Sequence, residues 1–114
     1  MWLGNLRGNK YSRDNKLVDP YWSKYWSFNL SELAADLSEN IEFVRKQADS
    51  DKIAFVGHGH SASLLFMNMY EHGHKIEDRI SSCIALAPIA HTDYTNNEFY
   101  DFYSRYWRSF KRSV

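Results

Sequence analysis

The order of apolar patterns along the chain predicts an α/β fold with about three mostly parallel strands and crossover helices. Short apolar runs, of the kind found in buried strands, alternate with longer stretches whose apolar residues recur at three- and four-residue spacing. That alternation is typical of a parallel sheet whose strands are connected by helices. The length of 114 residues fits one small domain, and the aromatic content of 17% supplies ample side-chain surface for a core.

The first part of the chain is expected to hold a strand, a loop and a helix. The apolar start from Met1 to Asn5 favours a strand, which runs into a turn-rich stretch of glycine and asparagine. Residues 10–28 are dense in aromatic residues but lack a regular period, which indicates a surface loop with aromatic anchors. Apolar spacing predicts a helix over 30–48, and Asn29 with Glu32 can form a capping box at its start.

Two further strands and a helix are expected in the middle of the chain. Residues 52–56 form a compact apolar run typical of a strand buried on both faces. A helix follows over 61–72, and Gly73 is expected to end it. Residues 82–90 repeat the buried-strand pattern as far as Pro88, and Cys83 within them is expected to be a buried, unreactive thiol.

The chain is expected to divide into a partial core over 1–92 and an amphipathic helix within 93–114. Thr95 and Glu98 can form a capping box before that helix. Its aromatic residues follow a helical period: Phe99, Phe102, Tyr103, Tyr106, Trp107 and Phe110. Basic residues oppose this stripe. The favoured interpretation is a helix that packs on the core or begins a further region, and the alternative is a helix that lies on an anionic membrane.

Composition excludes several classes of partner. Lys and Arg together number 14, as do Asp and Glu, so no strong overall field points to nucleic acid. No segment approaches the ~18 apolar residues of a membrane span, and no signal peptide is recognisable, so the compartment stays open. No cofactor motif is present. The His-Gly-His pairs 58–60 and 72–74 suggest a metal, but they flank a helix some ~15 Å long, so no metal site is expected.

A nucleophile elbow is the one chemical motif that the pattern indicates. In that motif, G-x-S-x-G, a buried strand turns sharply into a helix and presents a serine at the apex. Here Gly57, His58, Gly59, His60 and Ser61 stand between an expected strand and an expected helix. Glycine therefore holds the middle position of the motif, and Ser61 holds the position of its last glycine.

Three ordered blocks of the sequence resemble the acid lipase family, which includes the gastric and lysosomal acid lipases. Trp2 to Arg13 is similar to the family's "WLGN-RGN-YSR" block, and Phe55 to His58 is similar to its "VGHSQG" elbow. Leu86 to Ala90 resembles its "LAPVA" strand end. The resemblance implies a truncated α/β-hydrolase core and an ester hydrolase of triacylglycerols or cholesteryl esters that uses a Ser, Asp, His triad. The family is secreted or lysosomal.

Carried over by position, the resemblance implies that the elbow has lost its nucleophile. Gly59 stands at the serine, and His60 would lend its backbone N–H to the oxyanion hole. Gly57, His58 and Ser61 complete the surrounding turn. The family's acid and histidine would lie beyond Val114, and the second oxyanion donor before Met1, so the chain is predicted to be inactive.

Two local substitutes for the triad are disfavoured. Ser61, two positions after the apex, is expected to face the packing between helix and strand rather than a substrate. His91 and Asp93 stand at positions unlike those of the family's triad and are expected to belong to a polar loop.

The family's strand order also predicts an incomplete sheet. In that order an additional strand separates the strand at Met1 to Asn5 from the strand at 52–56, which leaves either a gap or a shifted pairing. Unpaired edges favour self-association. The resulting hypotheses are an inactive lipase remnant with a lipid or ester as ligand, a peripheral membrane module that uses the C-terminal helix, or one part of a longer enzyme.

Overall fold

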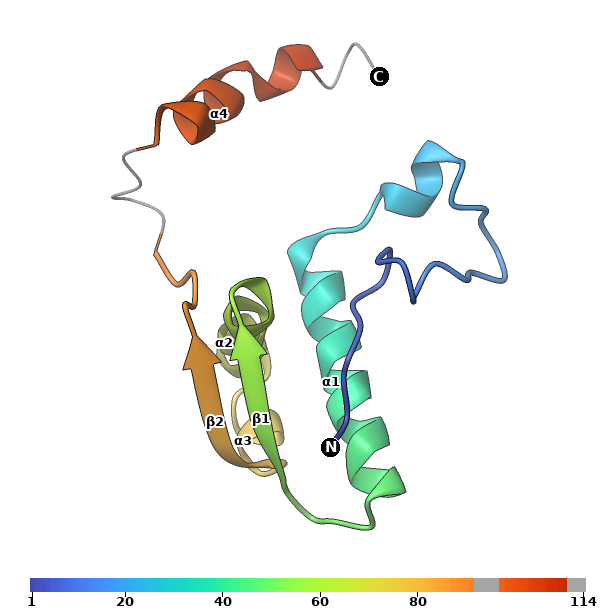
Figure 1. Ribbon diagram of the computed structural model, residues 1–114, viewed down its shortest axis with the longest axis vertical. Helices are drawn as coiled ribbons and strands as arrows, with labels where there is room; N and C mark the ends of the chain where they lie inside the picture. Colours follow the sequence, from blue (N-terminus) through green and yellow to red (C-terminus); the bar gives the residue numbers. More distant parts are fainter. Residues whose placement is uncertain (92–96, 111–114) are drawn as a thin grey trace.

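The computed structural model describes residues 1–91 and 97–110. Its elements in chain order are η1 (Ser23–Trp26), α1 (Leu30–Gln47), β1 (Ile53–His58), α2 (His60–His72), α3 (His74–Glu77), β2 (Ile80–Leu86) and α4 (Glu98–Phe110). Mixed helices and a parallel pair of strands make this a partial α/β fold (Figure 1). The capping box predicted at Thr95 falls outside the described residues.

The helices predicted by apolar spacing form within two residues of their expected ends. At the start of α1, the Asn29 side chain accepts a hydrogen bond from the Glu32 N–H, and the Glu32 carboxylate accepts one from the Asn29 N–H, which confirms the capping box. Gly73 ends α2 with a φ of +48°, a conformation that favours glycine. These ends are fixed by local chemistry, which explains why the sequence reveals them.

Within residues 1–91 and 97–110 the sheet has two strands, where about three were expected. β1 and β2 run parallel, with Val56 opposite Ile84 and His58 opposite Leu86. The strand predicted from Met1 to Asn5 does not form. That segment runs alongside α1 instead, where the Trp2 ring meets the Phe43 ring edge-on at 6.0 Å between centroids. A strand needs a hydrogen-bonded neighbour, and none lies beside these residues.

A hollow of about 470 Å³ separates the N-terminal segment from β1. Residues of α1 form its third wall, and its lining includes Trp2, Leu6, Val44, Phe55 and Val56. Met1 to Asn5 therefore makes no shifted pairing with β1, and a sheet that lacks one strand stays a prediction.

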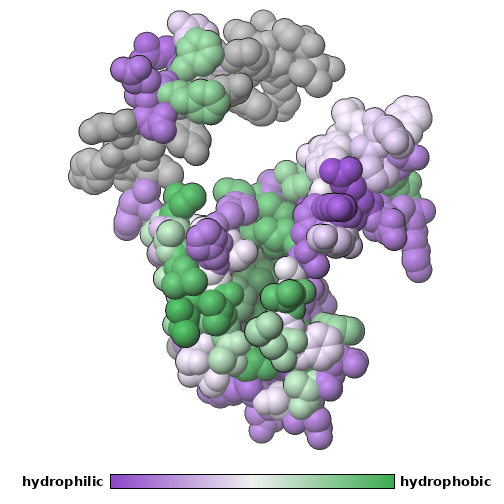
Figure 2. Space-filling model, in the orientation of Figure 1, coloured by the Kyte–Doolittle hydropathy of each residue, from purple (hydrophilic) through white to green (hydrophobic). Residues whose placement is uncertain are grey.

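The core lies on one side of the sheet, between α1, α2 and β1. Its buried side chains are Leu33, Ala34, Leu37, Ile41, Leu64, Leu65, Ile76 and Ile80, with Ile53 and Phe55 packed against them. The opposite face carries Val56, Ile84 and Leu86, all exposed. Figure 2 shows apolar side chains gathered on this face of the molecule. The expectation of strands buried on both faces is therefore wrong, because the core helices cover one face.

Cys83 is exposed, contrary to the buried thiol predicted from its apolar neighbours. β2 is the outer strand of the pair, and most of its residues are exposed whichever face they lie on. An apolar run indicates a strand that can be buried. Whether it is buried depends on whether other helices or strands pack against it.

Helix α4 lies apart from the sheet and the core helices (Figure 1). The expectation that this helix packs on the core or begins a further region stays a prediction. Phe99, Phe102 and Tyr106 are exposed, and the rings of Phe102 and Tyr106 lie 4.9 Å apart. The side chains of Tyr103, Trp107 and Phe110 are outside the described part of the structure. The division into 1–92 and 93–114 stays a prediction.

Candidate functional site

The turn between β1 and α2 has the shape that the sequence motif requires. β1 ends at His58, α2 begins at His60, and Gly59 between them has a φ of +55° and a ψ of −118°. Residues with a side chain rarely adopt this conformation, which glycine adopts without steric penalty. A Cβ atom built on Gly59 would meet no heavy atom within 4 Å. The apex therefore points into open space, where a side chain would be accessible.

Gly57 allows the strand and the following helix to approach closely. A Cβ atom at this position would lie 2.9 Å from the backbone nitrogen of Ala62 and 2.7 Å from the Phe55 ring. Gly57 and Ala62 are both buried. The first small residue of the motif is thus needed for packing, whether or not the apex carries a nucleophile.

The end of β2 is fastened to the same turn. The Gly59 N–H donates to the Leu86 carbonyl oxygen at 2.8 Å. The Ser63 hydroxyl accepts a hydrogen bond from the Ile89 N–H at 3.0 Å and donates to the Gly59 carbonyl oxygen at 3.3 Å. Ala87, between these contacts, has a positive φ of 45°. The apex and the segment after β2 therefore form one unit.

Sequence reasoning missed Ser63. The signal that could have found it is a hydroxyl four residues after the apex, in the first turn of the predicted helix, where serine often bonds to a backbone carbonyl one turn earlier. Its second bond, to Ile89, depends on how β2 ends and could not be read from local pattern.

The other predicted elbow residues differ in exposure. His58 and His60 are exposed, and Ser61 is half-buried and lines the hollow beside β1. As the first residue of α2, His60 has no preceding helical carbonyl for its backbone N–H, and the first N–H groups of a helix carry partial positive charge. This end of α2 can therefore donate hydrogen bonds to an anionic oxygen beside Gly59.

The remaining histidines do not complete a site at the turn. His60 and His72 are at opposite ends of α2, and the side chain of His74 is outside the described part. His91 is exposed, and Asp93 lies outside the described residues. Among residues 1–91 and 97–110, no group of three or more His, Cys, Asp or Glu side chains is arranged to hold a metal. None of the helices described has the length and apolar character needed to cross a bilayer.

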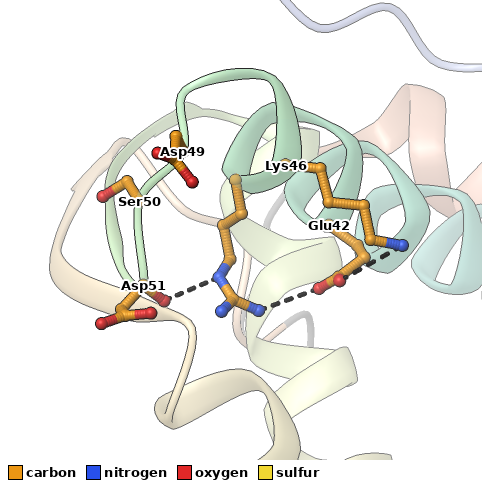
Figure 3. A pocket seen from close by; sticks show the side chains of 6 residues that line it. Glu42, Lys46, Asp49, Ser50 and Asp51 are labelled. Atoms are coloured by element: carbon orange, nitrogen blue, oxygen red, sulfur yellow. Dashed lines mark hydrogen bonds and ion pairs between the residues drawn. The ribbon is translucent and has the colours of Figure 1, made fainter.

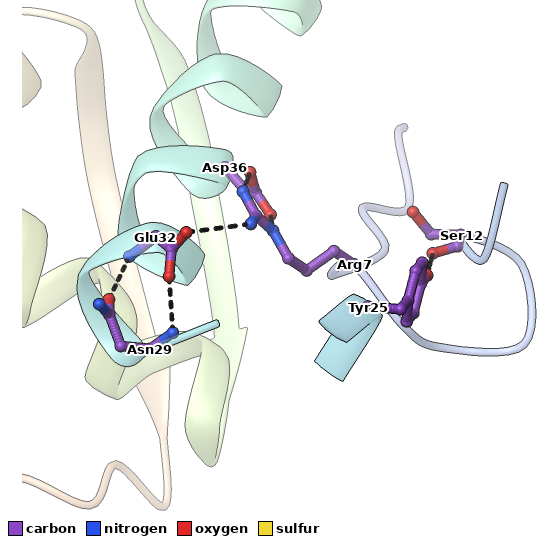
Figure 4. A network of polar contacts seen from close by, with 6 residues as sticks. All are labelled: Arg7, Ser12, Tyr25, Asn29, Glu32 and Asp36. Atoms are coloured by element: carbon purple, nitrogen blue, oxygen red, sulfur yellow. Dashed lines mark hydrogen bonds and ion pairs between the residues drawn. The ribbon is translucent and has the colours of Figure 1, made fainter. Parts of the chain in front are cut away.

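Arg7 joins the N-terminal loop to α1. Its guanidinium donates two hydrogen bonds to the Asp36 carboxylate and lies 3.8 Å from a Glu32 oxygen (Figure 4). The hydrogen bonds that Arg7 donates to Asp36 are the main cause that raises the pKa of Arg7 above its ordinary value. Arg7 therefore connects the loop to acidic residues on α1. Within the loop, the Asn9 side chain accepts a hydrogen bond from the Tyr11 N–H at 2.8 Å.

A second charged cluster surrounds the C-terminal end of α1. Glu42 accepts a hydrogen bond from Arg45 at 2.9 Å and lies 3.5 Å from the Lys46 ammonium (Figure 3). The Arg79 guanidinium also lies 3.6 Å from Glu42. The partial burial of Glu42 acts to raise its pKa, but the charges of Arg45, Arg79 and Lys46 together outweigh that effect and lower the pKa. The shallow pocket here is lined by charged and polar side chains, including Asp49, Ser50 and Asp51. Glu42, Arg45 and Lys46 are paired with one another, which indicates a structural role for these three side chains.

Comparison with known proteins finds related lipases. No family model matches the chain. The gastric triacylglycerol lipase of Mus musculus is 34% identical over 100 residues, which are 87% of this chain and 25% of the relative. That of Homo sapiens is 33% identical over 98 residues, 85% of this chain and 24% of the relative. Lipase member J of Homo sapiens is 35% identical over 95 residues, 82% of this chain and 26% of the relative.

The match covers only a segment of each of these relatives. The chain spans about a quarter of their length, and nearly all of the chain is covered by the match. The aligned region thus extends well beyond the turn at Gly59 and includes most of the core described above. The chain is related, over most of its own length, to a segment of the gastric and acid lipase family.

Proposed function

We propose that this chain is a lipase-related α/β-hydrolase segment that does not hydrolyse esters through an elbow serine. The observation that carries the proposal is Gly59, which occupies the apex between β1 and α2 and has no side chain to attack a carbonyl. The proposal depends on this residue and not on where the chain begins or ends.

The size of the expected defect follows from the chemistry of the triad. In serine hydrolases, loss of the nucleophile alone lowers turnover on the order of a million-fold. What survives of the site is the tight strand-to-helix turn and the backbone N–H groups at the start of α2, His60 first among them. These groups can bind an ester oxygen weakly, but they cannot form an acyl intermediate.

The ligand class is taken from the relatives. Their printed names describe lipases, including gastric triacylglycerol lipases. On this basis the ligand proposed for this chain is a lipid or another ester. The exposed apolar side chains beside the turn, Val56, Leu86 and Ile89, are compatible with such a ligand.

A serine-directed fluorophosphonate probe tests the proposal. We expect no stoichiometric labelling of the chain under conditions in which an active gastric lipase is labelled completely. The matched variant is Ser61→Ala, which removes the serine nearest the apex in sequence. Stoichiometric labelling that this variant abolishes would identify Ser61 as a nucleophile and overturn the proposal.

A second candidate function is contact with a membrane surface through α4. The observation in its favour is the exposure of Phe99, Phe102 and Tyr106 on a helix that also carries Arg105. Apolar and aromatic residues on one face with basic residues on another are typical of helices that lie in a membrane interface.

Co-sedimentation with anionic vesicles separates the two candidates. A membrane role predicts binding by the intact chain, and loss of that binding in a chain that ends at Thr95 and in the variant Phe102→Ser. Tyr70→Ser, an exposed aromatic residue on α2, is the control. Equal binding by all four proteins, or binding by none, would contradict a role for α4.

A further inference from the structure

The N-terminal end of α1 carries a sequon for N-linked glycosylation. Asn29, Leu30 and Ser31 match the pattern Asn-X-Ser or Asn-X-Thr, in which X is any residue except proline. None of the other asparagines in the sequence is followed two positions later by serine or threonine. The sugar is attached to the asparagine side chain, so use of the motif requires an accessible residue whose amide nitrogen is free.

The whole motif lies on the surface. Asn29, Leu30 and Ser31 are all exposed, Leu30 to 51%. The backbone of Asn29 is extended, with a φ of −112° and a ψ of 178°, and α1 begins at the next residue. Asn29 therefore belongs to the loop between η1 and α1, and surface loops are the segments in which glycosylated asparagines are found.

The two polar atoms of the Asn29 amide have separate uses. Its Oδ1 atom accepts a hydrogen bond from the Glu32 N–H at 3.0 Å, and the Glu32 carboxylate accepts one from the Asn29 N–H at 2.8 Å (Figure 4). Among residues 1–91 and 97–110, the Asn29 Nδ2 atom has no hydrogen-bond partner. An N-linked sugar is bonded to this nitrogen and leaves the oxygen as an acceptor. Glycosylation is therefore compatible with the capping box.

The contacts of the folded chain do not require this combination of residues. Aspartate and serine cap a helix about as well as asparagine, so the cap has no need of the Asn29 amide nitrogen. The Ser31 hydroxyl donates to the Glu71 carboxylate at 2.9 Å, but both residues are exposed. Substitutions at exposed positions of this kind usually change stability little. The fold therefore needs less at positions 29 and 31 than the motif supplies.

We propose that Asn29 carries an N-linked glycan when the chain is translated into the endoplasmic reticulum, and that the glycan extends from the start of α1 while the capping box stays intact. The donor is a lipid-linked oligosaccharide. The Asn29 Nδ2 atom forms a bond to the anomeric carbon of the first sugar and loses a proton. The bond from that carbon to the lipid pyrophosphate breaks, and the pyrophosphate leaves with the electron pair. This modification is independent of the proposed function.

Translation of the full chain behind a cleavable signal peptide, in the presence of microsomes, tests the site. We expect a single step in mobility that peptide N-glycosidase removes, with conversion of Asn29 to aspartate seen by mass spectrometry. Asn29→Asp keeps a capping oxygen without an acceptor nitrogen and should lose the step. Ser31→Ala should lose it as well. Ser27→Ala, an exposed serine outside the motif, is the matched control and should keep it.

Thermal unfolding tests whether the cap survives the modification. The glycosylated chain should unfold at or above the midpoint of the unmodified chain, whereas Asn29→Ala, which removes the capping oxygen, should lower the midpoint by several degrees. Three outcomes would overturn the proposal: no glycan on the natural chain in microsomes, a glycan that persists in Asn29→Asp, or a glycosylated chain as destabilised as Asn29→Ala. A variant that fails to fold still reports in microsomes, because the sugar is transferred before folding.

Discussion

At the scale of single residues, two glycines of the turn after β1 have different physical roles. Gly57 is needed for space, because the Ala62 backbone lies against it. Gly59 is needed for its conformation, because its φ is +55°. Space is not the reason, since a Cβ at this position would meet no heavy atom within 4 Å. The same motif therefore contains one steric and one conformational requirement, and substitutions can separate them.

Gly59→Ala is expected to destabilise the fold through backbone strain alone. A non-glycine residue held in a sparsely populated φ/ψ region costs of order 1 to 3 kcal/mol. Thermal unfolding followed by circular dichroism should show a midpoint several degrees lower. Gly4→Ala is the control, since Gly4 also has open space around its Cβ position but no positive φ. Equal midpoints for the two variants would show that the conformation at Gly59 carries no strain.

Gly57→Ala is expected to act by steric overlap. The added methyl group would meet backbone atoms of Ala62 at 2.9 and 3.0 Å, and backbone cannot rotate away as a side chain can. Overpacking of this kind costs roughly 1 to 3 kcal/mol and displaces the start of α2. Denaturant unfolding should show a lower midpoint than that of the natural chain. A midpoint unchanged from the natural chain would mean that α2 and β1 are less closely packed than the structure shows.

At the scale of elements, the contact between α1 and α2 contains one buried polar side chain. Asn68 is 0% exposed, and its amide nitrogen donates to the Ala34 carbonyl oxygen and, at 2.7 Å, to the Ser38 hydroxyl. Its Oδ1 atom has no partner among the described residues. Asn68 thus fixes the position of the two helices at the expense of one unsatisfied acceptor.

Asn68→Ala is expected to lower the free energy of unfolding by roughly 1 to 3 kcal/mol. The substitution removes two hydrogen bonds and leaves a cavity between the helices, while it also removes the unsatisfied oxygen, so the net loss is moderate. Urea unfolding measures it. Tyr70→Ala on the same helix is the control, because Tyr70 is exposed, and its effect should stay within ~0.5 kcal/mol. A similar loss in both variants would argue against a specific role for Asn68.

At the scale of the whole molecule, one layer of helices covers one face of a two-stranded sheet. Glu42 connects parts of that layer that are far apart in sequence, since it binds Arg45 on α1 and lies near Arg79, just before β2. Its lowered pKa means that the folded state favours the ionised form. Glu42 therefore stabilises the fold above its ordinary pKa of 4.5, and this contribution disappears as pH falls through the lowered pKa.

The pH dependence of the variant Glu42→Gln follows from that sign. Near neutral pH the variant should unfold at a lower temperature than the natural chain, and the difference should shrink as pH falls below 4.5. Thermal scans across this range measure the effect. Glu39→Gln, an exposed position on α1 with the same change of charge, is the control. A difference that grows in acid would contradict the sign of the pKa shift.

Local chemistry explains what the sequence by itself determined. The capping box at Asn29, the end of α2 at Gly73 and the turn at Gly59 each depend on residues within a few positions of one another. The apolar periods of α1 and α2 and the apolar runs of β1 and β2 are equally local, so all four elements could be predicted. The resemblance to the acid lipases also rests on short blocks of sequence.

Only the tertiary structure decided which faces of these elements are buried and which residues distant in sequence form contacts. Met1 to Asn5 carries a strand-like pattern but forms no strand, because no strand lies beside it. Cys83 is exposed, because β2 lies at the edge of the layer. The bonds from Arg7 to Asp36 and from Ser63 to Ile89 join residues 29 and 26 positions apart. Burial and pairing of this kind depend on partners distant in sequence, which a local pattern cannot specify.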